Sequence, residues 1–95
     1  MSAYSDIDPV IEEWSVRHAL HIYTHFKDSE VRSTELVSPA GKRWQIWVDS
    51  PDGQGVGVHA WDFKAMRHDM KVPISKLGEA LDESVRVVRQ WMQTA

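Results

Sequence analysis

Residues 42–63, KRWQIWVDSPDGQGVGVHAWDF, alternate apolar and polar side chains on both sides of a Pro-Asp-Gly sequence. Alternation with a period of two is typical of β-strands that bury one face, and such a turn joins antiparallel strands. A three-residue loop at 51–53 pairs apolar residues with each other, and it is favoured over a loop one residue shorter or longer, which would set Ile46 against His59. The segment therefore predicts a β-hairpin with six core residues on one face: Trp44, Ile46, Val48, Val56, Val58 and Ala60.

The opposite face of this hairpin is polar and aromatic, with the predicted pairs Gln45–His59, Trp47–Gly57 and Arg43–Trp61. Leaving a large apolar side chain in water costs up to about 3 kcal/mol, so Trp47 and Trp61 need a cover. A ring lying across the bare backbone of Gly57 is one explanation. A second core layer, formed by the C-terminal helix or by the linker 62–73, is another. The third is a partner or ligand surface, which exposed aromatic residues often mark.

The turn at 38–42 has the same Ser-Pro-x-Gly-polar pattern as the turn at 50–54. Two such turns predict a three-stranded antiparallel meander whose first strand covers 31–38. Residues 19–26 also alternate apolar and polar side chains, which adds a fourth strand to the meander. The linker 62–73 has mixed polarity and suggests no more than a short helical turn.

Two helices flank the predicted sheet. Asp8 before Pro9 suggests an N-cap, and the apolar spacing that follows holds until about His18. A second, longer helix over 74–95 has an apolar stripe of Ile74, Leu77, Leu81, Val85, Val88 and Met92, widened by Ala80, Val87 and Trp91. We therefore expect a single domain, 1–95, of the α+β class. Its parts are an N-terminal helix, an antiparallel meander of three to four strands and a long C-terminal helix packed on one sheet face.

Composition excludes several classes of protein. The chain has 95 residues, a formal charge of −3 and no cysteine, which excludes disulfides and thiolate chemistry. A negative balance argues against a nucleic-acid binder, which needs clustered lysine and arginine. The first residues lack the basic and apolar regions of a signal peptide, and no apolar run reaches the roughly 20 residues of a membrane span. We expect a soluble cytoplasmic protein without a membrane segment.

Three histidines, His18, His21 and His25, have a spacing that would bring them to one side of a helix and onto a metal ion. In the strand reading, His21 and His25 lie about 13 Å apart and cannot bind the same ion. The histidines can bind one metal ion only if residues 18–26 are helical. Because we interpret 19–26 as a strand, we expect neither a metal nor a cofactor.

His59 shares its face with Asp49 and Glu35, and imidazole can act as a general base. No sequence motif for nucleophilic catalysis, phosphate binding or dinucleotide binding accompanies it. We therefore interpret His59 as a surface or half-buried histidine beside tryptophan, and predict no catalytic residue.

The leading functional hypothesis is a small non-catalytic interaction module. Its predicted binding residues are Trp47, Trp61, His59 and Gln45, because tryptophan combines large contact area with a hydrogen-bond donor. The partner is another protein or a second copy of the chain, which would give a homodimer. The alternative is a small-molecule-binding protein or an enzyme with a histidine-containing pocket, with a metal-dependent version if the other three histidines converge. Nucleic-acid binding ranks third.

Overall fold

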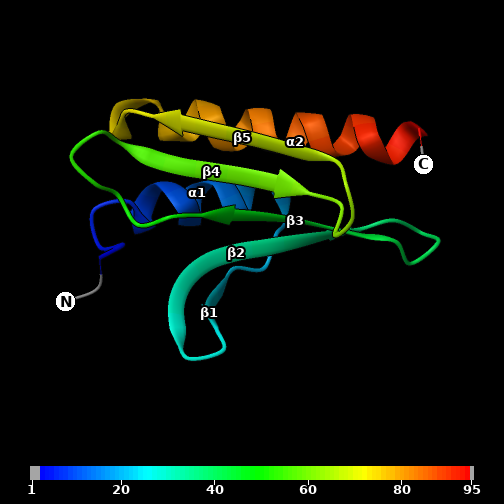
Figure 1. The fold of residues 1–95 in the computed structure, drawn as a ribbon, viewed down its shortest axis with the longest axis horizontal. Coiled ribbons are helices and arrows are strands. Elements are labelled where there is room, and N and C mark those ends of the chain that lie inside the picture. The colour runs from blue at the N-terminus through cyan, green and yellow to red at the C-terminus, as the bar shows by residue number, and fades with distance from the viewer. Residues whose placement is uncertain (1–2, 95) are drawn as a thin grey trace.

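A computed structural model describes residues 3–94 as one antiparallel sheet with two helices (Figure 1). The strands follow each other in a meander, in the order β1-β2-β3-β4-β5. The α+β class, the two terminal helices and the antiparallel meander are confirmed, but the sheet has five strands where three to four were expected. The elements are α1 (Asp8–His18), β1 (Tyr23–Phe26), β2 (Ser29–Val37), β3 (Arg43–Val48), β4 (Val56–Trp61), β5 (Arg67–Val72), a 3₁₀ turn (Ile74–Lys76) and α2 (Leu77–Thr94).

The additional strand, β5, occupies the predicted linker 62–73. The loop before it contains no glycine or proline, so the usual turn signal is missing. The Asp62 carboxylate instead closes the loop by accepting hydrogen bonds from the backbone N–H groups of Lys64, Ala65 and Met66 at 2.8, 2.9 and 3.1 Å. Phe63 takes a positive φ of 66° within this loop. A side chain thus provides the turn that sequence reasoning expected from backbone-permissive residues.

The β3–β4 hairpin confirms the predicted faces but corrects the register by two residues. Trp47 lies opposite His59, and Gln45 lies opposite Trp61. The chain reverses later than expected, around a bridge between Asp52 and Gly55. Because side chains alternate with a period of two, an even shift leaves every residue on its predicted face. The six predicted core residues are accordingly buried, with exposed fractions between 0 and 2%.

Both helices pack on this buried face, and Figure 1 shows them together behind the strands. Ile11 and Trp14 of α1 join the core, as do Leu81 and Val88 of α2. Ile74, which was expected in the stripe of α2, is 43% exposed in the preceding 3₁₀ turn. Within residues 3–94, no helix combines the length and the apolar character needed to cross a membrane.

The end of α1 falls at His18, as predicted, where Ala19 takes a left-handed conformation with φ of 54°. The strand that follows begins at Tyr23, later than expected. Asp8 does not cap the helix through its side chain. It binds the buried guanidinium of Arg32 instead, at 2.8 and 3.1 Å, and so ties the start of α1 to β2.

Candidate functional site

We call the sheet face opposite the two helices the outer face. All four predicted binding residues lie on it, since residues directly opposite each other in a sheet share a face. Neither helix packs on this face, so the predicted second core layer from the C-terminal helix is absent. The linker contributes to the face by extending the sheet as β5, and not by folding over it. The outer face comprises Ser33 and Glu35 of β2, Arg43, Gln45 and Trp47 of β3, Gly57, His59 and Trp61 of β4, and Arg67, Asp69 and Lys71 of β5.

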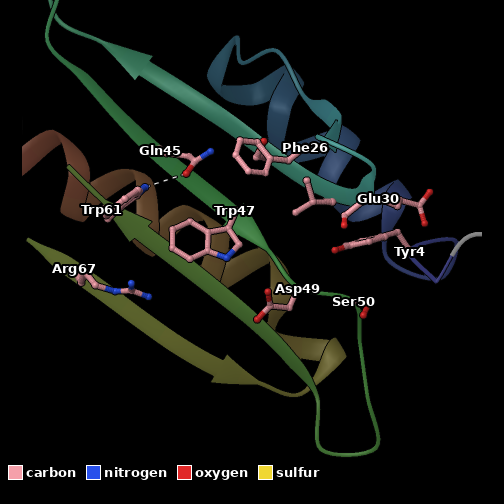
Figure 2. A pocket seen from close by; sticks show the side chains of 12 residues that line it. Tyr4, Phe26, Glu30, Gln45, Trp47, Asp49, Ser50, Trp61 and Arg67 are labelled. Atoms are coloured by element: carbon pink, nitrogen blue, oxygen red, sulfur yellow. Dashed lines mark hydrogen bonds between the residues drawn. The ribbon is translucent and has the colours of Figure 1, made fainter. Parts of the chain in front are cut away.

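Aromatic rings form a continuous row along this face. Trp47 stacks on His59 with ring centroids 4.8 Å apart and an interplanar angle of 20°. Its other ring neighbour is Trp61, in a T-shaped contact at 6.3 Å. Trp61 in turn contacts Phe63 at 5.2 Å. The Nε1–H group of Trp61 donates to Oε1 of Gln45 at 2.9 Å (Figure 2), so the structure brings the four predicted residues together. Phe63 extends the row and was missed in a segment read as linker.

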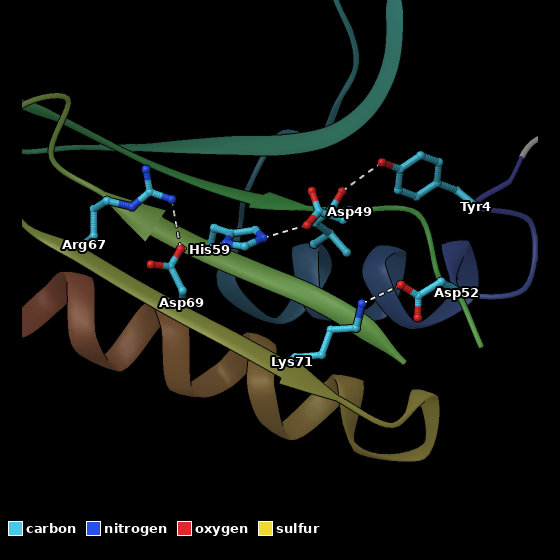
Figure 3. A network of polar contacts seen from close by, with 8 residues as sticks. Tyr4, Asp49, Asp52, His59, Arg67, Asp69 and Lys71 are labelled. Carbon is cyan, nitrogen blue, oxygen red and sulfur yellow. Dashed lines mark hydrogen bonds and ion pairs between the residues drawn. The ribbon is translucent and has the colours of Figure 1, made fainter. Parts of the chain in front are cut away.

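His59 is held between two carboxylates, and this group is called the His59 clasp. Its Nε2 lies 2.7 Å from Asp49 and its Nδ1 lies 2.6 Å from Asp69 (Figure 3). Arg67 donates to Asp69 at 3.0 Å and places its guanidinium 5.4 Å from the centre of the Trp47 ring. The bonds from Arg67 and then His59 hold the pKa of Asp69 below its usual value. The clasp therefore connects β4 and β5 with the residue that follows β3, beside Trp47.

Gly57 serves this clasp, and not the tryptophan that was expected to lie across it. A Cβ atom at this position would lie 2.6 Å from Oδ2 of Asp49 and 3.0 Å from Nε2 of His59. The absent side chain thus leaves the space in which the two groups meet. The prediction that the Trp47 ring lies across the backbone of Gly57 is wrong, because His59 and not Gly57 lies opposite Trp47 in the observed register.

A groove of about 640 Å³ runs along the outer face beside Trp47 and Trp61. Its second wall is the β1–β2 hairpin, which contributes Glu30 and the ring of Phe26, 62% exposed (Figure 2). One end is closed by Tyr4, whose hydroxyl donates to the carbonyl oxygen of Val48 at 2.9 Å. Sequence reasoning missed Phe26 and Tyr4, because only the bend of the hairpin and the path of the N-terminal segment bring them to β3.

The clasp determines what His59 can do chemically. Both ring nitrogens lie against carboxylate oxygens, so neither is directed at a substrate in the groove. Asp49 is part of this arrangement, as its position suggested, whereas Glu35 pairs with Arg43 at 3.5 Å. This geometry positions Trp47 better than it suits general-base catalysis, which needs a nitrogen within reach of the reacting proton.

The three N-terminal histidines contact separate partners. His18 lies 2.9 Å from Asp82, His21 packs edge-on against Tyr23, and His25 lies 3.0 Å from the Thr24 hydroxyl. Across residues 3–94, no group of three or more histidine, cysteine or acidic side chains is arranged to hold a metal ion. Comparisons with protein-family models, with curated proteins and with solved structures gave no significant match.

Proposed function

We propose that the protein is a non-catalytic interaction module that binds a second copy of itself through the outer face. The observation that carries this proposal is the row of aromatic rings on a sheet face that neither helix covers. Trp47 and Trp61 remain half-buried in the single chain, so a partner that covered them would gain the free energy of burying the part of each indole that is still exposed.

The rigidity of the row supports a binding role. His59 supports one side of Trp47, and Gln45 holds the indole N–H of Trp61. Ordering a mobile side chain on association costs roughly 0.5–1.5 kcal/mol, and this cost is smaller for side chains that are already held in place. The two tryptophans are therefore arranged as anchors before any partner arrives.

Charge supports a second copy as that partner. In a symmetric interface the same patch meets itself, so a patch with one sign of charge would repel its copy. On and beside the outer face, acidic and basic groups instead pair locally. The pairs are Glu35–Arg43 at 3.5 Å, Asp69–Arg67 at 3.0 Å and Asp52–Lys71 at 2.6 Å. The net charge of −3 over the chain is consequently not concentrated on this face.

The dimensions of the molecule leave room for an interface of standard size. The molecule measures 39 Å along its longest axis and 26 Å across, a footprint of about 1,000 Å². A specific interface of standard size buries about 800 Å² on each partner. Two open sheets that meet face to face pack about 10 Å apart, with the side chains of the two inner faces interdigitating. The outer faces of two copies would form such a sandwich, with the helices outside.

Sedimentation equilibrium over a wide range of protein concentration tests the proposal. We expect the wild type to dimerise, and Trp61→Ala to weaken the association by at least about tenfold, since a central tryptophan anchor contributes about 2 kcal/mol or more. Ser33→Arg keeps both tryptophans but adds a bulky charge opposite Trp47, and it should weaken association as well. Val16→Ala changes a side chain of α1 that is 79% exposed and serves as the control. A wild type that stays monomeric at millimolar concentration would contradict the proposal.

The groove favours a second candidate function, the binding of a small organic molecule. Its volume of about 640 Å³ falls in the usual range of roughly 300–1,000 Å³ for ligand pockets. Trp47 and Trp61 offer aromatic surface, and Gln45 and Arg67 offer polar contacts. Fluorescence titration with anilinonaphthalene sulfonate separates the two functions. Saturable binding of the probe by a monomeric wild type, lost in Trp61→Ala, would favour the small-molecule site. A dimeric wild type that does not bind the probe would favour self-association.

A further inference from the structure

We infer that protonation of His59 regulates association through the outer face, an inference that rests on the proposed function. The clasp places a carboxylate oxygen within 2.7 Å of each ring nitrogen, at Asp49 on one side and Asp69 on the other. An imidazolium has two N–H donors and can bond both carboxylates at once. A neutral imidazole has a single N–H donor and can bond only one of them.

Loss of the proton to solvent therefore opens one side of the clasp, because a ring lone pair then faces a carboxylate. Asp69 keeps its bond from Arg67 in that state. Within the described residues, the Asp49 carboxylate is hydrogen-bonded through His59 alone, so Asp49 is the group expected to turn away. Asp49 lines the groove next to Trp47, so this movement changes the site itself.

Imidazole is the side chain that ordinarily changes its charge near neutral pH, and the titratable groups that face His59 come from the residue after β3, from β5 and from the N-terminal segment. On β5, Arg67 donates a hydrogen bond to Asp69, and Lys71 is paired with Asp52. The Arg67 bond keeps Asp69 ionised. Beyond Asp49, burial and then the Asp49 charge raise the pKa of Tyr4 above 10, so Tyr4 stays neutral.

The sign of the effect follows from the charge balance of the clasp. With His59 protonated, the imidazolium and Arg67 balance the two carboxylates Asp49 and Asp69. With His59 neutral, the group carries one net negative charge, and a symmetric interface brings two such groups towards each other. The His59 ring, on which Trp47 stacks, is then held by a carboxylate on one side only. Association should therefore be strong at acidic pH and weaken as pH rises through the range in which imidazole loses its proton.

Dimer dissociation constants at pH 5.5 and pH 8.0 test this inference. We expect association of the wild type to be about tenfold weaker at the higher pH. In His59→Gln, which has no titrating ring, the two constants should agree within about twofold. His21→Gln removes an exposed histidine of the segment before β1 and should keep the wild-type dependence. Thermal unfolding of each variant at both pH values shows whether the fold is intact.

The remaining outcomes separate the inference from the function on which it rests. A wild type that dimerises equally at both pH values overturns the regulation and leaves self-association standing, as does a pH dependence that survives in His59→Gln. A wild type that is monomeric at both values overturns both. Nitrogen-15 chemical shifts of the His59 ring report the clasp independently of association: two N–H groups at pH 5.5 support it, and a single N–H group at that pH contradicts it.

Discussion

At the scale of single residues, Gly57 is a position on the outer face where a side chain would not fit without a shift of its neighbours. The Asp49 carboxylate and the His59 ring meet over its bare backbone, in the space that a Cβ atom would fill. His59 can then support Trp47 while both of its nitrogens are bonded. The absence of a side chain at Gly57 thus makes room for the His59 clasp, which orients Trp47.

Gly57→Ala should open the clasp without unfolding the chain. The added methyl group would displace the end of the Asp49 side chain, which is 54% exposed and able to move, so we expect stability to fall by only about 1 kcal/mol. Urea denaturation gives this value. Gly53→Ala is the matched control, since a Cβ atom there meets nothing within 4 Å, and it should change stability by less than about 0.5 kcal/mol. Equal effects of the two substitutions would show that Gly57 has no special role.

At the scale of elements, the loop between β4 and β5 depends on one side chain. The Asp62 carboxylate accepts three backbone N–H bonds and is itself buried. Burial acts to raise the pKa of Asp62, but the hydrogen bonds from Lys64, Met66 and Ala65 outweigh it, so its pKa lies below the usual value. The loop places Phe63 against Trp61 and starts the strand that supplies Arg67 and Asp69 to the site.

Asp62→Ala should lower the melting temperature and weaken the β4–β5 pairing, because three backbone N–H groups lose their acceptor. Asp62→Asn keeps a side-chain oxygen in place and should recover most of the loss. Amide hydrogen exchange in β5 distinguishes local from global effects, with faster exchange expected in the alanine variant. Equal melting temperatures for the alanine and asparagine variants would mean that the hydrogen bonds do not hold the loop.

Part of this architecture was predictable from sequence, and the reason lies in periodicity. Alternation separated the buried Trp44 from the outward Trp47 and Trp61, because an error of two residues in register does not change the face. The same error gave Trp47 the wrong partner. The strand β5 was missed because Asp62 replaces the glycine or proline that usually marks a turn. Phe26 and Tyr4 reach the site through the bend of a hairpin and the path of a loop, which no local pattern indicates.

At the scale of the whole molecule, ion pairs join elements that are distant in the chain. Asp82 of α2 accepts hydrogen bonds from Arg17 at 2.9 and 3.0 Å and lies 2.9 Å from His18, which ties α2 to the end of α1. Burial acts to raise the pKa of Asp82, but the bonds with His18 and Arg17 outweigh it and lower the pKa. Asp82, like Asp62 and Asp69, therefore favours the folded state when its carboxyl group is ionised.

Acid should therefore destabilise the fold. A carboxyl group whose pKa is lower in the folded state stabilises the protein above its unfolded value, about 3.9 for aspartate, and this contribution is lost as pH falls through the folded value. We expect the urea midpoint to fall between pH 5 and pH 2. Asp82→Asn should be less stable than the wild type at pH 6 and should approach it at pH 2. A constant difference between the two proteins over this range would show that the Asp82 charge makes no contribution.

The most direct test of self-association through the outer face is whether Trp47 and Trp61 become less exposed to solvent as protein concentration rises. Acrylamide quenching of tryptophan fluorescence, measured at pH 5.5 over increasing protein concentration, reports the exposure of Trp47 and Trp61. The background is the constant signal of the buried Trp14 and Trp44 and of Trp91, which is half-buried against the core. Self-association through the outer face predicts that quenching decreases as concentration rises, and that Ser33→Arg removes this decrease. Quenching that stays the same from micromolar to millimolar protein would contradict the proposed interface.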